Sequence, residues 1–319
     1  MSHSRFKSHF LFTISLFLIV SRIWGQEAEQ YYTSSLKFAE KGAYQQALIN
    51  INKAIGIDSS KAEYFLQRAE IQFNLGDYDN TIKNCYATLN LKPNLPEVHL
   101  LRGKVCVVTE SYGPAILFFT KTLKYTNNDD LRFDALLNRG NTYLAIQRYT
   151  EALNDFNEAF SINHSSLEVM LSLSETYKEL DQPNQAIELL NKTIEINPDY
   201  APAYELLGKT AFDKNDFPMA ISAYEKYLVL NPNEIEAHNF LAELYLQTQD
   251  YEKALNSLNN TLSIDPLEPN AYRIKGLIYL AQEDKEKGCN TLFRAMQLGY
   301  FEKYGYDLLD LYMEKCEEE

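Results

Sequence analysis

Residues 249–266 read QDYEKALNSLNNTLSIDP, and residues 215–232, which lie 34 places earlier, read NDFPMAISAYEKYLVLNP. Apolar residues recur in both stretches at intervals of three and four, the pattern of one face of an α-helix, and each stretch ends in proline, which stops a helix. Repetition at a short fixed interval is typical of stacked structural units. The two stretches therefore predict a helical repeat of 34 residues.

The same interval extends over most of the chain. Copies begin near residues 28, 62, 96, 133, 167, 201, 235 and 269, if three residues are inserted within TNNDDLR (126–132). Position 8 is then Ser, Ala or Gly in all eight copies, and position 20 is Ala, Thr or Gly. Small residues at two fixed positions allow two helices to cross closely. Each copy is expected to hold helix A at about positions 1–14, a tight turn, and helix B at about positions 18–30.

The ten prolines test this frame independently, because proline is excluded from helix interiors and accepted in a first turn. All ten fall at a predicted helix start or just after a predicted helix end. They lie at position 32 (Pro93, Pro198, Pro232, Pro266), at position 1 or 2 (Pro96, Pro202, Pro269) and at positions 17–19 (Pro114, Pro183, Pro218).

Together with an aromatic residue at position 11 or 17, these features resemble the tetratricopeptide repeat family. The aromatic residues that carry the resemblance are Tyr143, Tyr149, Tyr177, Tyr245, Tyr251 and Tyr279. The resemblance covers residues 28–302. It implies an all-α fold, a right-handed α-solenoid of about eight helix-turn-helix units, followed by a capping helix and acidic end at 303–319.

Composition and motifs argue against catalysis and against nucleic acid. The chain has 30 basic and 44 acidic residues and a net charge of −14, whereas phosphate binding needs a cationic surface. It contains no HExxH, no CxxC pair and no glycine-rich phosphate loop. His99 and His238 occupy position 4, a packing position filled elsewhere by aromatic residues. We predict no enzyme, no cofactor and no metal site.

The N-terminus predicts export. Arg5 and Lys7 precede the apolar run FLFTISLFLIV (10–20), which is too short to span a bilayer and is typical of a signal peptide. Residues 1–25 are therefore predicted to be a signal peptide, and the chain is expected in the periplasm or cell envelope. The alternative is an uncleaved N-terminal membrane anchor.

Export to an oxidising compartment makes the four cysteines disulfide candidates. The segment GCNTLFRAMQLGY…EKC, with Cys289 and Cys316, resembles the C-terminal end of secreted repeat proteins of Bacteroidetes-type bacteria. Cys85 and Cys106 are predicted on neighbouring helices of the stack. For both pairs, the other reading is two buried free thiols.

The family resemblance also implies a binding groove. In this family, positions 2, 5, 9, 12 and 13 of the A helices face a concave surface. Here they supply an apolar strip with a few polar residues, so the candidate groove residues are Leu66, Glu70, Phe73, Leu100, Lys104, Val107, Leu137, Asn141, Leu144, Leu171 and Glu175. Acids at position 2 have another explanation, since they stabilise the helix dipole.

Two functions follow from this reading. The first is a non-catalytic scaffold or adaptor that binds a partner protein in the groove, through a peptide or helix with hydrophobic and basic residues. The alternative is a regulatory or targeting subunit of a cell-envelope enzyme or of a secretion or assembly complex. The insertion at 126–132 is expected to form either a longer loop, or a bend or contact point.

Overall fold

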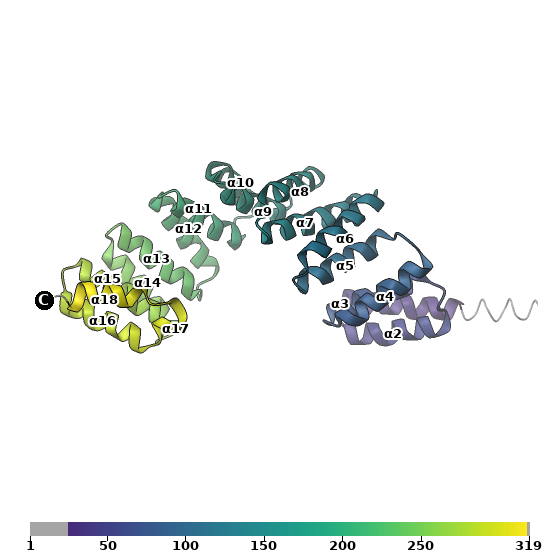
Figure 1. Cartoon of the computed structure of the whole chain (residues 1–319), viewed down its shortest axis with the longest axis horizontal. Coiled ribbons are helices and arrows are strands. Elements are labelled where there is room, and N and C mark those ends of the chain that lie inside the picture. Colours follow the sequence, from purple (N-terminus) through teal and green to yellow (C-terminus); the bar gives the residue numbers. More distant parts are fainter. Residues whose placement is uncertain (1–24, 318–319) are drawn as a thin grey trace, which may run out of the picture. The chain divides into compact units, whose positions relative to one another are not determined.

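The computed structural model of the chain describes residues 25–317, which divide into two compact units between Asn163 and His164. In the first unit, residues 25–40 form a helix. It is followed by α2 (Tyr44–Ile57), α3 (Ala62–Asn74), α4 (Tyr78–Leu91), α5 (Pro96–Val108), α6 (Tyr112–Tyr125), α7 (Asp129–Ala145) and α8 (Tyr149–Ile162). Consecutive helices pack as antiparallel pairs, and each pair packs on the next (Figure 1).

The second unit continues the same alternation. Its helices are α9 (Leu167–Glu179), α10 (Pro183–Ile196), α11 (Ala201–Asp213), α12 (Phe217–Leu230), α13 (Ile235–Gln247), α14 (Tyr251–Ile264), α15 (Pro269–Ala281) and α16 (Lys285–Gln297). Short elements close the unit: α17 (Tyr300–Tyr304), α18 (Asp307–Tyr312) and the π-helical turn η1 (Met313–Glu317). The described part of the chain holds helices and turns and no strand, so the predicted all-α helix-turn-helix fold is confirmed.

The backbone itself repeats with the predicted frame. Position 15, in the turn between helices A and B, has a positive φ in all eight copies. These residues are Gly42, Gly76, Glu110, Gln147, Asp181, Asn215, Gln249 and Glu283, with φ between 55° and 76°. A left-handed residue directly after a helix lets the following N–H groups bond back to the last carbonyls of that helix. Only two of the eight are glycine, so the tertiary packing of each pair imposes this turn.

Helices A and B of a pair approach closely at position 8, as predicted, and the structure shows what fills the space. The side chain at position 24 of helix B lies flat on position 8. A Cβ added to Gly140 would be 2.6 Å from the ring of Phe156, and one added to Gly208 would be 2.6 Å from the ring of Tyr224. The small residue at position 8 therefore makes room for a bulky side chain from the partner helix.

The insertion at 126–132 is neither a long loop nor a bend. Residues 129–132 form the first turn of α7, which is 17 residues long, against 13 in α3 and α5. The Asn128 side chain accepts a hydrogen bond from the N–H of Leu131 at 2.9 Å and so caps the lengthened helix. Asp129 and Asp130 in the first turn complement the helix dipole.

The predicted capping helix at 303–316 is broken. Gly305 has φ +94° and separates α17 from α18, because a left-handed residue cannot continue a right-handed helix. The break lets α17 reach back toward α15: Lys303 and the Tyr304 hydroxyl donate to the buried carboxylate of Glu268 at 2.8 and 2.6 Å. Leu308 of α18 packs with Leu292 of α16, so the end of the unit is covered as predicted.

The predicted signal peptide lies almost wholly outside the described residues. No helix within residues 25–317 combines the length and apolar character needed to cross a membrane.

Candidate functional site

The first unit contains a hollow of about 410 Å³ over three successive A helices, α3, α5 and α7. Its lining residues are Glu70, Phe73, Asn74, Glu97, Leu100, Leu101, Lys104, Leu131 and Asp134. The hollow therefore has an apolar floor from four side chains, three carboxylates and a single cation. We call it the α3–α7 hollow.

The repeat period explains why these residues meet. Helices α3, α5 and α7 are each helix A of consecutive copies and lie next to one another, so equal positions along them fall side by side. Glu97 and Asp134 both occupy position 2, while Glu70 and Lys104 both occupy position 9. Residues at positions 2 and 9 are two helical turns apart and share one face of the helix.

The charges of the hollow are incompletely paired. One carboxylate oxygen of Glu97, Oε2, is buried and has no hydrogen-bond partner. Glu70 as a whole is exposed, but crowding of its carboxylate by protein atoms raises its pKa; the positive charge of Lys104 opposes the rise, and the negative charge of Glu97 adds to it. An added cation would pair with these carboxylates and relieve their mutual repulsion.

Leucines at position 5 do not form the exposed strip that the sequence suggested. Leu100 is 7% exposed and Leu137 is 6% exposed. Leu100 belongs to a core cluster with Ala115, Phe119 and Ala135, which come from its own pair and the next. In copy three, position 5 therefore packs between successive repeats, and only the edge of Leu100 reaches the hollow.

The other predicted groove residues lie around the hollow or away from it. Leu66 and Val107 are half-buried against core clusters, and Leu144 is half-buried. Asn141 is exposed on α7. Leu171 and Glu175 lie on α9 and belong to the second unit, so the hollow brings together four of the predicted residues: Glu70, Phe73, Leu100 and Lys104.

Five lining residues were missing from the predicted set. Glu97 and Asp134 stand at position 2, where helix-dipole stabilisation was explanation enough, and Asn74 stands at the groove position 13. Leu101 is at position 6, beside the buried Leu100. Leu131 comes from the insertion and enters the hollow because α7 starts early. The insertion thus contributes one apolar side chain to the hollow.

The four cysteines have two different environments. Cys289 and Cys316 form a disulfide with their Cα atoms 5.6 Å apart, which joins α16 to η1. Cys85 and Cys106 are free. Cys85 is buried with Ala69 and Val98, whereas Cys106 packs in the cluster of Leu100, so the disulfide considered for this pair is absent.

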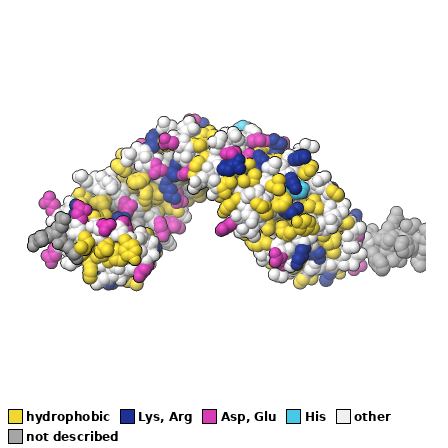
Figure 2. All heavy atoms as spheres, viewed as in Figure 1, with side chains coloured by type: hydrophobic (Ala, Val, Ile, Leu, Met, Phe, Trp, Pro, Cys, Tyr) yellow, Lys and Arg dark blue, Asp and Glu magenta, His cyan; other side chains and the backbone are white. Residues whose placement is uncertain are grey.

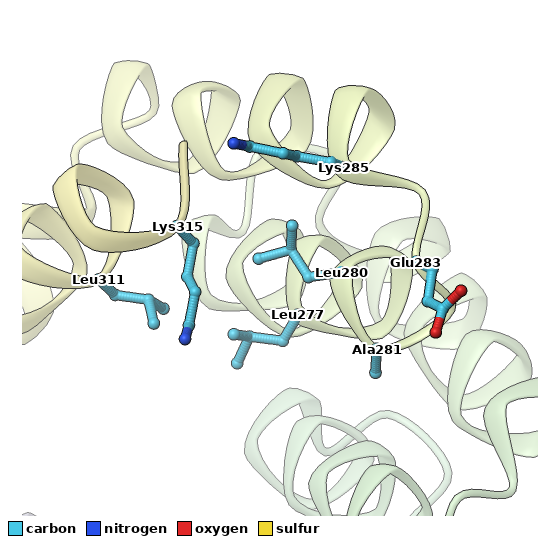
Figure 3. Close-up of a pocket in the computed structure, with 7 residues that line it drawn as sticks. All are labelled: Leu277, Leu280, Ala281, Glu283, Lys285, Leu311 and Lys315. Carbon is cyan, nitrogen blue, oxygen red and sulfur yellow. The ribbon is translucent and has the colours of Figure 1, made fainter. Parts of the chain in front are cut away.

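A second hollow, of about 460 Å³, lies at the C-terminal end of the second unit. It is lined by Leu277, Leu280, Ala281, Glu283, Lys285, Leu311 and Lys315 (Figure 3). The ammonium groups of Lys285 and Lys315 point in different directions, so no charged groups converge there (Figure 3). The α3–α7 hollow is therefore the stronger candidate. Within residues 25–317, no three His, Cys, Asp or Glu residues are placed to hold a metal ion.

Three models of the tetratricopeptide repeat family match the chain, over residues 131–199, 171–235 and 211–278. Residues 131–278 are therefore tetratricopeptide repeats. Proteins of this family are scaffolds for protein interaction. The matched residues run from the start of α7 to α15 and agree with the repeat frame read from the sequence.

Solved structures with the same fold include bacterial tetratricopeptide repeat proteins. PilW, described as a widely conserved type IV pilus biogenesis factor, matches with a TM-score of 0.62 and 19% identity, over 68% of this chain and 99% of that one. PilF of Pseudomonas aeruginosa matches with a TM-score of 0.61 and 18% identity, over 69% of this chain and 99% of PilF. A tetratricopeptide repeat protein from Parabacteroides merdae matches with a TM-score of 0.57 and 20% identity, over 80% of this chain and 99% of that protein.

A curated human relative is tetratricopeptide repeat protein 13, which is 26% identical over 133 residues. The match covers 40% of this repeat protein and 15% of the relative, so this chain matches only a small part of it.

Proposed function

We propose that this repeat protein is a non-catalytic scaffold that binds a segment of a partner protein in the α3–α7 hollow. The segment would place an apolar side chain on the floor and a lysine or arginine between the carboxylates. The observation that carries the proposal is the composition of the hollow: Glu70, Glu97 and Asp134 face one cation, Lys104, above an apolar floor.

Charge and burial favour a cationic side chain with an aliphatic stem. Lys and Arg can lay their methylene groups on an apolar surface while their charged ends reach carboxylates. Glu97, which is half-buried and has one unpartnered carboxylate oxygen, would gain a neighbouring positive charge. Phe73 and Leu131, both half-buried, would lose their remaining contact with water when a neighbouring apolar side chain binds.

A selection from a phage-displayed peptide library tests the proposal. The wild-type protein should enrich peptides in which Lys or Arg stands beside a large apolar residue. The Glu70→Gln/Asp134→Asn variant keeps the size of both side chains and should lose the preference for a basic residue. Glu188→Gln, which alters an exposed carboxylate of α10, is the control and should enrich the wild-type consensus.

Failure to enrich any such peptide, or an identical basic consensus for the wild type and the double variant, would contradict binding in the hollow. Circular dichroism of each variant checks that the helices are intact.

We further propose that the chain is exported and acts in the cell envelope. The basic start and the apolar run at 10–20 support export, and a disulfide such as Cys289–Cys316 persists in oxidising compartments. N-terminal sequencing of the protein from its native host should then begin near Gln26. Recovery of residues 1–25 on a membrane-bound protein would instead show an anchor.

A further inference from the structure

Three arginines occupy position 7 of copies two, three and four, and in two of them Nε donates a hydrogen bond to a side-chain oxygen. The Arg68 Nε donates to Asn84 at 2.9 Å, and its Nη1 donates to Asn52 at 3.0 Å. Arg139 makes two hydrogen bonds of 2.7 Å to the carboxylate of Asp155. In both cases the acceptor of the Nε hydrogen bond stands at position 23 of the helix B that follows.

Arg102, the third of these arginines, meets an aromatic ring at that position. Its guanidinium carbon lies 4.1 Å from the centre of the Phe118 ring and 4.8 Å from that of Tyr86. Nη2 donates to the Tyr86 hydroxyl at 3.2 Å, but Nε is buried without a partner. Among the described residues, no carboxylate forms an ion pair with Arg102. The guanidinium is therefore held in place while its charge is left uncompensated.

His99 departs from its equivalents in the same way. In three copies of the second unit, the side chain at position 4 contacts the carbonyl oxygen of the preceding proline. Tyr204 donates to Pro198, Tyr272 donates to Pro266, and Nε2 of His238 lies 2.9 Å from the Pro232 oxygen. His99 is 6% exposed, and neither ring nitrogen has a partner.

The His99 ring is stacked instead between two aromatic rings of α6. The ring centres of Phe118 and Tyr125 lie 6.4 and 5.8 Å away. Burial, reinforced by the positive charges of Lys121 and Arg102, lowers the pKa of His99. No carboxylate opposes this lowering.

These side chains form one continuous surface of α4, α5 and α6, which we call the α4–α6 cluster. Its members are Tyr86, His99, Arg102, Phe118, Lys121, Lys124 and Tyr125. Figure 2 shows histidine, Lys or Arg, and hydrophobic side chains together over this part of the first unit. Tyr86 is 52% exposed, and Tyr125 is also exposed, so the cluster is open to solvent.

The cluster contains no carboxylate to pair with its cations. Of the five buried side-chain polar atoms without a partner among the described residues, three belong to His99 and Arg102. Buried polar groups in proteins are almost always partnered, so such a concentration requires an explanation. An acceptor supplied from outside the chain would compensate the charge of Arg102 and pair with the ammonium groups of Lys121 and Lys124.

The charge of the whole chain limits what that acceptor can be. Residues 25–163 carry 14 basic and 16 acidic residues, whereas residues 164–319 carry 13 and 28. An extended polyanion such as nucleic acid would be repelled by the second unit. A short carboxylate-bearing segment can contact the three cations of the cluster and rest on its exposed aromatic rings.

We propose that the α4–α6 cluster is a second binding surface, which takes an acidic segment of a partner protein. Carboxylates of the segment pair with Arg102, Lys121 and Lys124, and an aromatic or aliphatic side chain packs on Tyr86 and Tyr125. This surface shares no residue with the α3–α7 hollow, so the repeat protein can hold a basic segment at one site and an acidic segment at the other.

The test uses the full chain and a fluorescein-labelled peptide in which glutamates flank a single tryptophan. Fluorescence anisotropy should show binding that weakens as salt is raised, and the glutamine version of the peptide should bind at least about fivefold more weakly. Lys121→Gln/Lys124→Gln should weaken binding of the glutamate peptide about fivefold. Arg102→Met should weaken it further, because it removes the guanidinium held by the two rings.

Lys192→Gln, which removes one exposed lysine of α10, is the matched control and should bind as the wild type does. The double lysine variant leaves Arg102 and the aromatic rings in place, so it remains informative if Arg102→Met does not fold. Equal binding of the two peptides, or unchanged binding by the lysine variant, would overturn the proposal. Dimerisation in low salt that these variants abolish would also overturn it, by making a second copy of the chain the occupant.

Discussion

Truncation of Leu137 to alanine should destabilise the middle of the first unit strongly. Leu137 lies on α7 and is 6% exposed, so nearly the whole side chain would be replaced by a cavity. Buried leucines truncated to alanine cost about 2–5 kcal/mol, and a site between stacked repeats that can partly relax should fall near about 3 kcal/mol. Because each repeat contacts only its neighbours, the loss should concentrate in α7 and the helices packed on it.

Hydrogen exchange measured by mass spectrometry reports the loss region by region. A destabilisation of about 3 kcal/mol should speed exchange of the protected amides of α7 and α8 by about a hundredfold. Leu117→Ala, on α6 with a side chain that is 54% exposed, is the matched control and should change stability by less than about 0.5 kcal/mol. Equal effects of the two substitutions would refute the assignment of position 5 to the core.

Three further outcomes are expected. Gly140→Ala should cost about 1–3 kcal/mol, measured by urea unfolding, because its Cβ would clash with the stiff ring of Phe156. Reduction of Cys289–Cys316, which are 27 residues apart, should remove about 3 kcal/mol of stability from the C-terminal cap and speed hydrogen exchange in α16 and α18. Burial raises the pKa of Cys85 from 9.0 to about 12, so iodoacetamide at pH 8 should not label it in the folded protein. Since the folded state keeps this proton and the unfolded state releases it, Cys85 should destabilise the protein as pH rises from 9.0 toward 12.

Each of these has a comparison within the chain. Gly113→Ala places its Cβ where no atom lies within 4 Å and should not destabilise α6. Reduction should leave exchange in α3 and α5 unchanged, since those helices lie in the other unit. Cys106 is only half-buried and should be alkylated before Cys85. Alkylation of Cys85 before Cys106 would contradict the burial described for the two thiols. Hydrogen exchange in the cap that does not change on reduction would contradict the role given to the disulfide.

The fold was predictable because the signal is repeated eight times. Small residues at positions 8 and 20 and prolines at helix ends are local requirements of helix geometry, and they agree from copy to copy. The insertion and the cap each occur once, so no repetition supports their interpretation. The structure was needed to show that Asn128 caps a longer α7. It was also needed to show that Gly305 breaks the terminal helix.

The candidate site was predictable only in part. The face of helix A follows from periodicity, and four residues of that face, Glu70, Phe73, Leu100 and Lys104, line one hollow. Periodicity does not show how deeply a residue on that face is buried, because burial depends on the distance between adjacent repeats. Periodicity therefore predicts an exposed Leu137, which is in fact buried, and it does not show that Glu97 lines a hollow shared with the neighbouring helices.

The most direct test of the central claim is a crystal structure of the full chain with a library-selected peptide that carries a basic residue beside an apolar one. We predict that the basic side chain lies within hydrogen-bond distance of Glu70, Glu97 or Asp134, and that the apolar side chain contacts Phe73 or Leu131. A peptide bound elsewhere on the chain, with the α3–α7 hollow open to solvent, would contradict it.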